Sequence, residues 1–178
     1  MTDAPTPASE ADVQDFANMS AALTGFQPAV LKPQIDPIEL ARTYYEFALS
    51  QVGATAMNAL LDAFRALQVQ QPPLSPQTIA DTLLEIVPLT TPPSPQALIC
   101  QSIIAMWYLG AWYIPGVQGG GGFPPTPLQI ISSQAYTNGL VWKVMQSHPM
   151  GFSAFTFGYW SQVPGSLASF GVNTGGGQ

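Results

Sequence analysis

Charge is distributed unevenly along this chain, and that limits which of its surfaces can face water. All ten acidic residues and three of the four basic ones lie within residues 1–85. Residues 86–178 contain Lys143 and His148 but no Asp, Glu or Arg. A free domain normally covers itself with charged side chains. We therefore expect another protein or, as the alternative, a membrane to cover part of the second half.

The overall composition excludes some classes of partner. A length of 178 residues suits one domain with a sizeable core. With 8% charged residues, a pI near 4.2 and no Lys/Arg cluster, the chain lacks what nucleic acid binding or a polybasic membrane anchor needs. The polar, acidic start has no signal-peptide pattern, so it does not indicate a compartment.

Helix start and stop signals predict a mainly α fold. Ser9 caps the first helix, which Gly25 ends, and three later helices each begin at a capping residue followed by Pro. We expect a compact bundle of about five to six helices within a domain of residues 9–146. The expected helices cover residues 9–24, 37–52, 55–68, 76–87, 96–113 and 135–146.

The remaining segments lack helical periodicity. Residues 1–8 are predicted to be a disordered N-terminus, and residues 116–127 a Gly/Pro loop. Residues 128–132 fit a short strand or an extended arm. Residues 147–178 are predicted to be a long irregular arm, rich in aromatic residues and Gly, which is stable only when it packs on a partner.

Residues 97–117 are the most apolar segment and suggest the membrane alternative. Their length approaches that of a membrane span, so the chain could be membrane-embedded or monotopic through this segment. Gln101 and Ser102 interrupt the segment, Pro115 ends it early, and no positive flanks orient it. A helix that is apolar all round is otherwise expected to be buried in the protein.

The sequence offers little material for catalysis. The glycine run 119–122 is followed by two prolines and no Lys-Ser/Thr pair, so it does not match a phosphate-binding loop. Cys100 and His148 are too few for a structural zinc site. A free-standing enzyme built on this Cys–His pair is the third alternative, although an apolar helix raises a thiol pKa. We expect no catalytic, cofactor or metal site in this chain.

The aromatic residues of the second half suggest a protein interface instead. Trp and Tyr are enriched in binding hot spots because they bury much area and keep a polar group. For Trp107 and Trp142, core and interface both remain open, whereas Tyr159 and Trp160 favour the interface. Cys100 is either a buried residue or a candidate for an intersubunit disulfide. The predicted interface residues are Trp107, Tyr108, Trp112, Tyr136, Asn138, Trp142, His148, Met150, Tyr159 and Trp160.

Several segments of residues 100–165 resemble the small subunit of membrane-bound FAD-dependent sorbitol dehydrogenases. The segments are AMWYLGAWYIPG (105–116), SQAYTNGLVWKVMQSHPMGFS (133–153) and FGYW (157–160). Relatives of this family accompany other sugar dehydrogenases. The elements are specific in combination, whereas none is specific alone.

The resemblance implies a non-catalytic accessory subunit that supports the folding, stability and export of a large flavoprotein subunit, in the manner of a chaperone. FAD, with iron–sulfur and haem c groups as further candidates, would belong to partner subunits, including a multihaem cytochrome c in some complexes. Membrane association would come through the complex. The family often carries a twin-arginine signal, whereas this sequence has no Arg-Arg pair. A periplasmic location at the cytoplasmic membrane is therefore expected from the resemblance alone.

Overall fold

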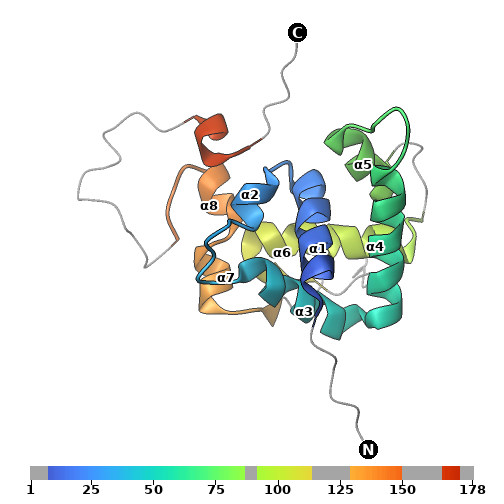
Figure 1. The fold of residues 1–178 in the computed structure, drawn as a ribbon. Helices are drawn as coiled ribbons and strands as arrows, with labels where there is room; N and C mark the ends of the chain where they lie inside the picture. Colours follow the sequence, from blue (N-terminus) through green and yellow to red (C-terminus); the bar gives the residue numbers. More distant parts are fainter. Residues whose placement is uncertain (1–7, 87–91, 114–128, 150–165, 173–178) are drawn as a thin grey trace, which may run out of the picture.

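The computed structural model describes residues 8–86, 92–113, 129–149 and 166–172, and this part of the chain is mainly helical, as predicted (Figure 1). The parts of the predicted termini, loop and arm at residues 1–7, 114–128, 150–165 and 173–178 lie outside it. A short antiparallel pair of strands accompanies the helices. The elements are α1 (Glu10–Thr24), α2 (Pro28–Leu31), α3 (Leu40–Val52), α4 (Ala54–Gln68), α5 (Pro76–Leu83), α6 (Pro95–Leu109), β1 (Ala111–Trp112), β2 (Gln129–Ile130), α7 (Ser133–Thr137), α8 (Leu140–Val144) and the 3₁₀ helix η2 (Leu167–Phe170).

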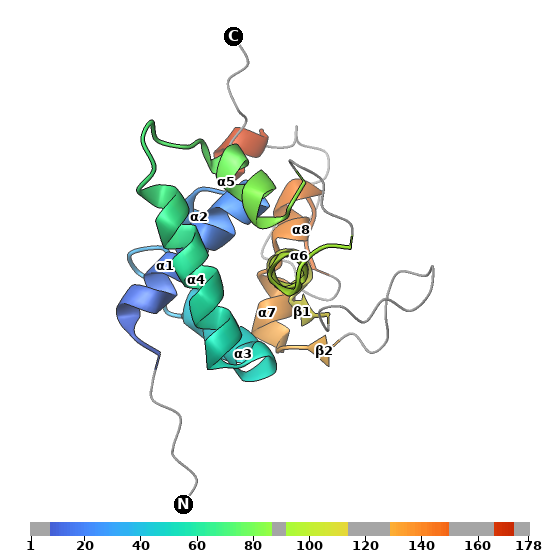
Figure 2. The ribbon, with the colours of Figure 1, turned by 90° about the vertical axis from the view of Figure 1, so that its right-hand side faces the viewer.

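Helix α1 is the centre of the bundle. It packs against α2, α3, α4, α5 and α6 (Figures 1 and 2). Its buried residues recur at helical spacing along one broad stripe. The buried apolar side chains form one continuous core that extends from α1 to α8. Phe16 of α1 contacts Tyr45 of α3 edge to face, with 5.6 Å between the ring centroids.

The predicted serine caps are confirmed. The hydroxyls of Ser9, Ser75 and Ser94 accept hydrogen bonds from amides three residues later, at 3.1, 3.1 and 3.2 Å. Each hydroxyl satisfies one of the orphan amides in the first turn of its helix. Gly25 and Gly53 follow α1 and α3 with positive φ, as expected for residues that end helices.

The predicted start of the second helix at Asp36-Pro37 is wrong. Helix α3 begins at Leu40, and Asp36 instead stabilises a turn before it. Its carboxylate accepts hydrogen bonds from the amides of Ile38 and Glu39, at 3.1 and 2.8 Å. Asp side chains stabilise such local turns in the same way as they cap helices, so the sequence signal does not separate the two.

The end of the sixth predicted helix also differs from the prediction. Helix α6 stops at Leu109, before the predicted end near Tyr113, because Gly110 adopts a left-handed conformation with φ of 66°. The chain then enters β1, which pairs with β2. The strand expected within residues 128–132 is confirmed over Gln129–Ile130.

The single helix predicted over residues 135–146 is instead two short helices, α7 and α8, separated by Asn138 and Gly139. Gly139 lies directly against α6: a Cβ atom at this position would be 2.7 Å from the carbonyl oxygen of Tyr108. Such a close backbone approach admits only glycine. The break therefore lets the α7–α8 segment fold onto the end of α6.

Residues 166–172, which fall in the predicted partner-binding arm, pack on the chain itself. Val172 forms an antiparallel bridge with Phe26, and the amide of Gln27 donates to the carbonyl of Gly171 at 2.9 Å. Helix η2 also lies against α8 (Figure 1). Residues 166–172 are thus anchored to the helical domain, and the prediction for the arm as a whole stays a prediction.

The basic residues of the first half are held in ion pairs. Arg65 of α4 bridges Asp12 and Asp15 of α1 at 2.6 and 2.7 Å and also contacts Asp62 at 3.0 Å. The Ser9 hydroxyl and the Arg65 guanidinium both lower the pKa of Asp12. This network links the outer surfaces of α1 and α4.

Gly110→Ala should destabilise the protein much more than Gly25→Ala. Both residues have positive φ, at 66° and 77°, so both variants pay a conformational cost of about 1–2 kcal/mol. A Cβ at Gly110 would also lie 2.5 Å from backbone atoms of Ala135 and Tyr136, whereas Gly25 has no atom within 4 Å. Urea denaturation of both variants measures the difference. Equal losses of unfolding free energy would contradict the close approach.

Arg65→Met should lower the free energy of unfolding near neutral pH. The difference from the wild type should become smaller below about pH 4. The folded pKa of Asp12 is lowered, so its stabilising contribution is present above the unfolded pKa and is lost as pH falls through the folded pKa. The urea midpoint, measured across this pH range, tests this expectation. Arg65→Lys, which keeps the charge without the planar fork, should give an intermediate midpoint. A deficit that is independent of pH would contradict the assignment.

Candidate partner-binding surface

Helices α6, α7 and α8 and strands β1 and β2 lie to one side of α1 and α4 (Figure 2). The described residues of this part include Lys143 and His148 but no carboxylate side chain. We call the described residues 92–113, 129–149 and 166–172 the uncharged unit, since Lys143 is the one Lys, Arg, Asp or Glu among them. Its exposed large apolar side chains, here called the apolar surface residues, are Leu109, Ile130, Val144, Met145 and Leu167.

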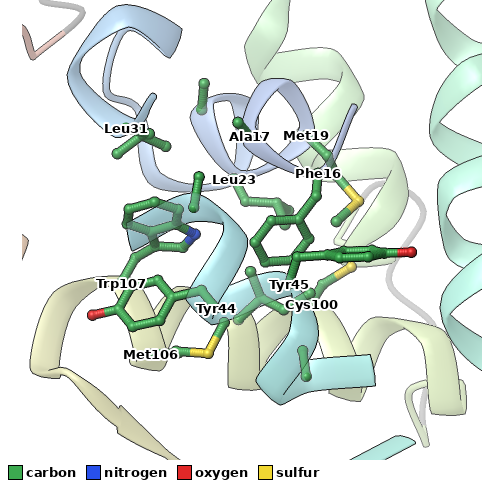
Figure 3. Close-up of a cluster of buried hydrophobic side chains, with 14 of the residues drawn as sticks. Phe16, Ala17, Met19, Leu23, Leu31, Tyr44, Tyr45, Cys100, Met106 and Trp107 are labelled. Carbon is green, nitrogen blue, oxygen red and sulfur yellow. The ribbon is translucent and has the colours of Figure 1, made fainter. Parts of the chain in front are cut away.

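Trp107 and Trp112 belong to the core. Each is 1% exposed, so neither presents a surface to a partner in this structure, and their assignment to the interface is wrong. The rings of Trp107 and Tyr44 meet edge to face with 4.7 Å between their centroids (Figure 3). The rings of Trp112 and Phe47 meet in the same way with 6.1 Å between their centroids. The Tyr44 hydroxyl donates to the carbonyl of Ala135 at 3.4 Å, which joins α3 to α7.

Tyr108, Tyr136 and Trp142 are half-buried and make contacts within the chain. The Tyr108 hydroxyl donates to the carbonyl of Thr24 at 2.9 Å, at the end of α1. The Trp142 indole N–H donates to the carbonyl of Tyr136 at 2.8 Å, and the two rings meet edge to face at 5.3 Å. These residues keep some exposure for a partner, although their described polar contacts stabilise the fold.

The polar candidates lie near the ends of the two short helices. Asn138 follows α7, and its side-chain amide donates to the carbonyl of Gln134 at 2.9 Å. His148 is half-buried, with Nδ1 3.1 Å from the carbonyl oxygen of Pro149. Met150, Tyr159 and Trp160 lie outside the described residues. The interface assignment of all five stays a prediction.

Cys100 is not placed to react with another molecule. Its side chain is fully buried on α6 (Figure 3), and burial raises the pKa of the thiol to about 12. A nucleophilic or disulfide-forming cysteine needs accessible thiolate. The assignments of Cys100 to an intersubunit disulfide and to a Cys–His catalytic pair therefore both disagree with this structure.

Clefts lined by described residues lie on the other, acidic part of the molecule. One, of about 150 Å³, contains Lys32 and Arg42, but both cations already pair with Glu10. Another, of about 320 Å³, is a mostly apolar crevice between α1, α4 and α5. In the described part of the chain, no group of His, Cys, Asp and Glu side chains could hold a metal ion.

No described helix is both long and apolar enough to cross a membrane. Helix α6, which contains most of the described part of the apolar segment at residues 97–117, has 15 residues and ends at Leu109. Many of its side chains are buried in the protein's own core.

Comparisons with known proteins add no relative. No family model, no curated protein and no solved structure matches this chain.

The apolar surface residues were missed by the sequence reasoning, which concentrated on aromatic side chains. Val144 and Met145 lie at the end of α8, where apolar residues stand on both sides of Lys143 and their order gives no sign of which face is outward. Leu167 lies in a segment without periodicity. The available signal was the charge deficit, which predicts exposed apolar residues without locating them.

The Cys100 thiol should not react with a thiol reagent such as Ellman's reagent in the native protein, and should react fully once the chain is unfolded in urea. The physical reason is that burial excludes the reagent and suppresses the thiolate. The time course of absorbance after mixing measures this. Rapid reaction of the folded protein would contradict the burial of Cys100.

Proposed function

We propose that this chain is the non-catalytic small subunit of a multi-subunit FAD-dependent dehydrogenase that oxidises a sugar or polyol of the sorbitol type. The chain supports the folding, stability and export of the large flavoprotein subunit, which holds FAD. Further redox groups, such as iron–sulfur and haem c, belong to partner subunits, and a multihaem cytochrome c is a candidate third component. The complex is located in the periplasm at the cytoplasmic membrane.

The observation that carries the proposal is the uncharged unit with its apolar surface residues. Met145 is 63% exposed and Ile130 is 55% exposed, in a part of the chain whose described residues contain no carboxylate side chain to solvate the neighbouring surface. Obligate complexes bury large surfaces of this apolar character. A permanent partner subunit accounts for the lack of charge without requiring a membrane-spanning helix.

The resemblance supports the identity of that partner. Its elements Trp107-Tyr108…Gly110 and Tyr136…Asn138-Gly139 lie in one compact region, where the end of α6 meets α7 and α8. Tyr108 and Gly139 touch directly, so these motif residues act together in shaping this region. The apolar surface residues Leu109, Val144 and Met145 lie on the same elements.

Met145→Glu should prevent the chain from retaining the flavoprotein. A carboxylate placed in an apolar interface without a partner costs about 3–5 kcal/mol, which corresponds to a loss of affinity of at least about a hundredfold. Because Met145 is exposed in the free chain, the variant should fold normally, as circular dichroism and thermal melting will show. Affinity purification from the native host, with flavin measured by absorbance, gives the yield of partner.

Val69→Glu is the matched control. Val69 is 76% exposed and follows α4, in the acidic part of the molecule, so the same added charge should leave the flavin yield unchanged. If the Met145→Glu chain retains as much flavoprotein as the wild type and the control, the surface is assigned wrongly. If no variant and no wild-type chain retains a flavoprotein, the proposed function itself is wrong.

A further inference from the structure

Residues 166–172 form a small structure of their own, which we call the strap. The Ser166 hydroxyl accepts a hydrogen bond from the amide of Ser169 at 3.2 Å and caps η2. The amide of Val172 donates to the carbonyl of Leu167 at 3.2 Å. These hydrogen bonds lie within the strap, so it can keep its local shape without help from the helical domain.

The strap meets the rest of the molecule in two places: η2 lies against α8, and residues 171–172 lie along a narrow backbone edge. Val172 bridges Phe26, and Gly171 accepts a hydrogen bond from the amide of Gln27 at 2.9 Å. Phe26 is fully buried and also meets the ring of Tyr108 at 6.2 Å. The edge therefore lies directly beside the contact between the end of α1 and α6.

Little of the strap is buried. Ser166 to Ser169 are exposed, and Phe170, Gly171 and Val172 are only half-buried. Regions with few buried apolar contacts open at a lower free energy than the core, in units that often coincide with local structures. The strap has the features of such a unit, since its own hydrogen bonds can survive detachment.

Gly171 fits against α2 in a way that no other residue can. Its φ is 79°, a conformation that side chains rarely adopt, and a Cβ atom would lie 2.3 Å from Cγ2 of Val30. Val30 is β-branched, and its χ1 is stiff on a helix, so it cannot easily turn aside. The fit of Gly171 against Val30 thus controls whether the strap can dock.

We propose that the strap is a detachable element, which opens as a unit while the helical domain stays folded. The close contact between Gly171 and Val30, here called the latch, determines whether the strap can dock. Opening uncovers the backbone edge at Phe26 and Gln27. The inference concerns this chain alone and does not depend on the proposed function.

Native-state hydrogen exchange of the full chain, followed by NMR at increasing urea, tests the proposal. The Gln27 amide should exchange faster than the core amides of α6. Its exchange should depend little on urea, because detachment of the strap exposes little surface. If the Gln27 amide exchanges at the same rate as the α6 amides and with the same urea dependence, the strap opens only with the whole protein, and the proposal is overturned.

Variants of the latch separate strap opening from general destabilisation. Gly171→Ala should accelerate exchange of the Gln27 amide by about tenfold or more and leave the α6 amides unchanged. Combining it with Val30→Ala should recover part of the protection, since the contacted Cγ2 atom is removed.

Gly53→Ala is the control, because Gly53 also has positive φ but no atom within 4 Å, and it should not change exchange at Gln27 through the strap. Equal acceleration at Gln27 and in α6 by Gly171→Ala, or no recovery in the double variant, would contradict the latch.

Discussion

The close backbone approach between the end of α6 and the α7–α8 segment is the constraint on which the second half of the structure depends. Gly110 and Gly139 allow it, since Cβ atoms at these positions would lie 2.5 and 2.7 Å from backbone atoms of the facing segment. The same approach brings the carbonyl of Ala135 to the Tyr44 hydroxyl, beside Trp107. A part of the chain with few charges is thereby fixed by main-chain fit and aromatic packing rather than by ion pairs.

The two halves of the molecule are stabilised in different ways. On the acidic side, Arg65 and Arg42 each contact several carboxylates and connect helices that are distant in sequence. Exposed ion pairs contribute little individually, and networks contribute more. The uncharged unit lacks carboxylates in its described residues. Exposed apolar side chains occur in both halves, but Val69 lies in the part that holds the carboxylates, whereas Met145 lies in the part that lacks them. This contrast is the physical basis for the proposal that a partner covers one side of the molecule.

Local signals in the sequence predicted the helices well, whereas the tertiary role of the aromatic residues could not be predicted. The serine caps and Gly25 act through hydrogen bonds and dihedral angles within a few residues, so their patterns are readable. The helix start predicted at Asp36 was wrong because an Asp carboxylate can accept hydrogen bonds from the amides of a turn as readily as from those of a helix. Trp107 is buried through contacts with a helix about sixty residues earlier in the sequence, and no local pattern encodes which apolar helix face meets that helix.

The most direct test of the account is to purify the tagged chain under mild conditions from its native host and to record the absorbance spectrum of what accompanies it. The account predicts a yellow complex with flavin bands, in which this chain and a larger subunit are present in fixed ratio, and dehydrogenase activity with a sugar or polyol. A colourless, soluble and well-behaved monomer would contradict it, because the uncharged unit would then need no partner to cover it.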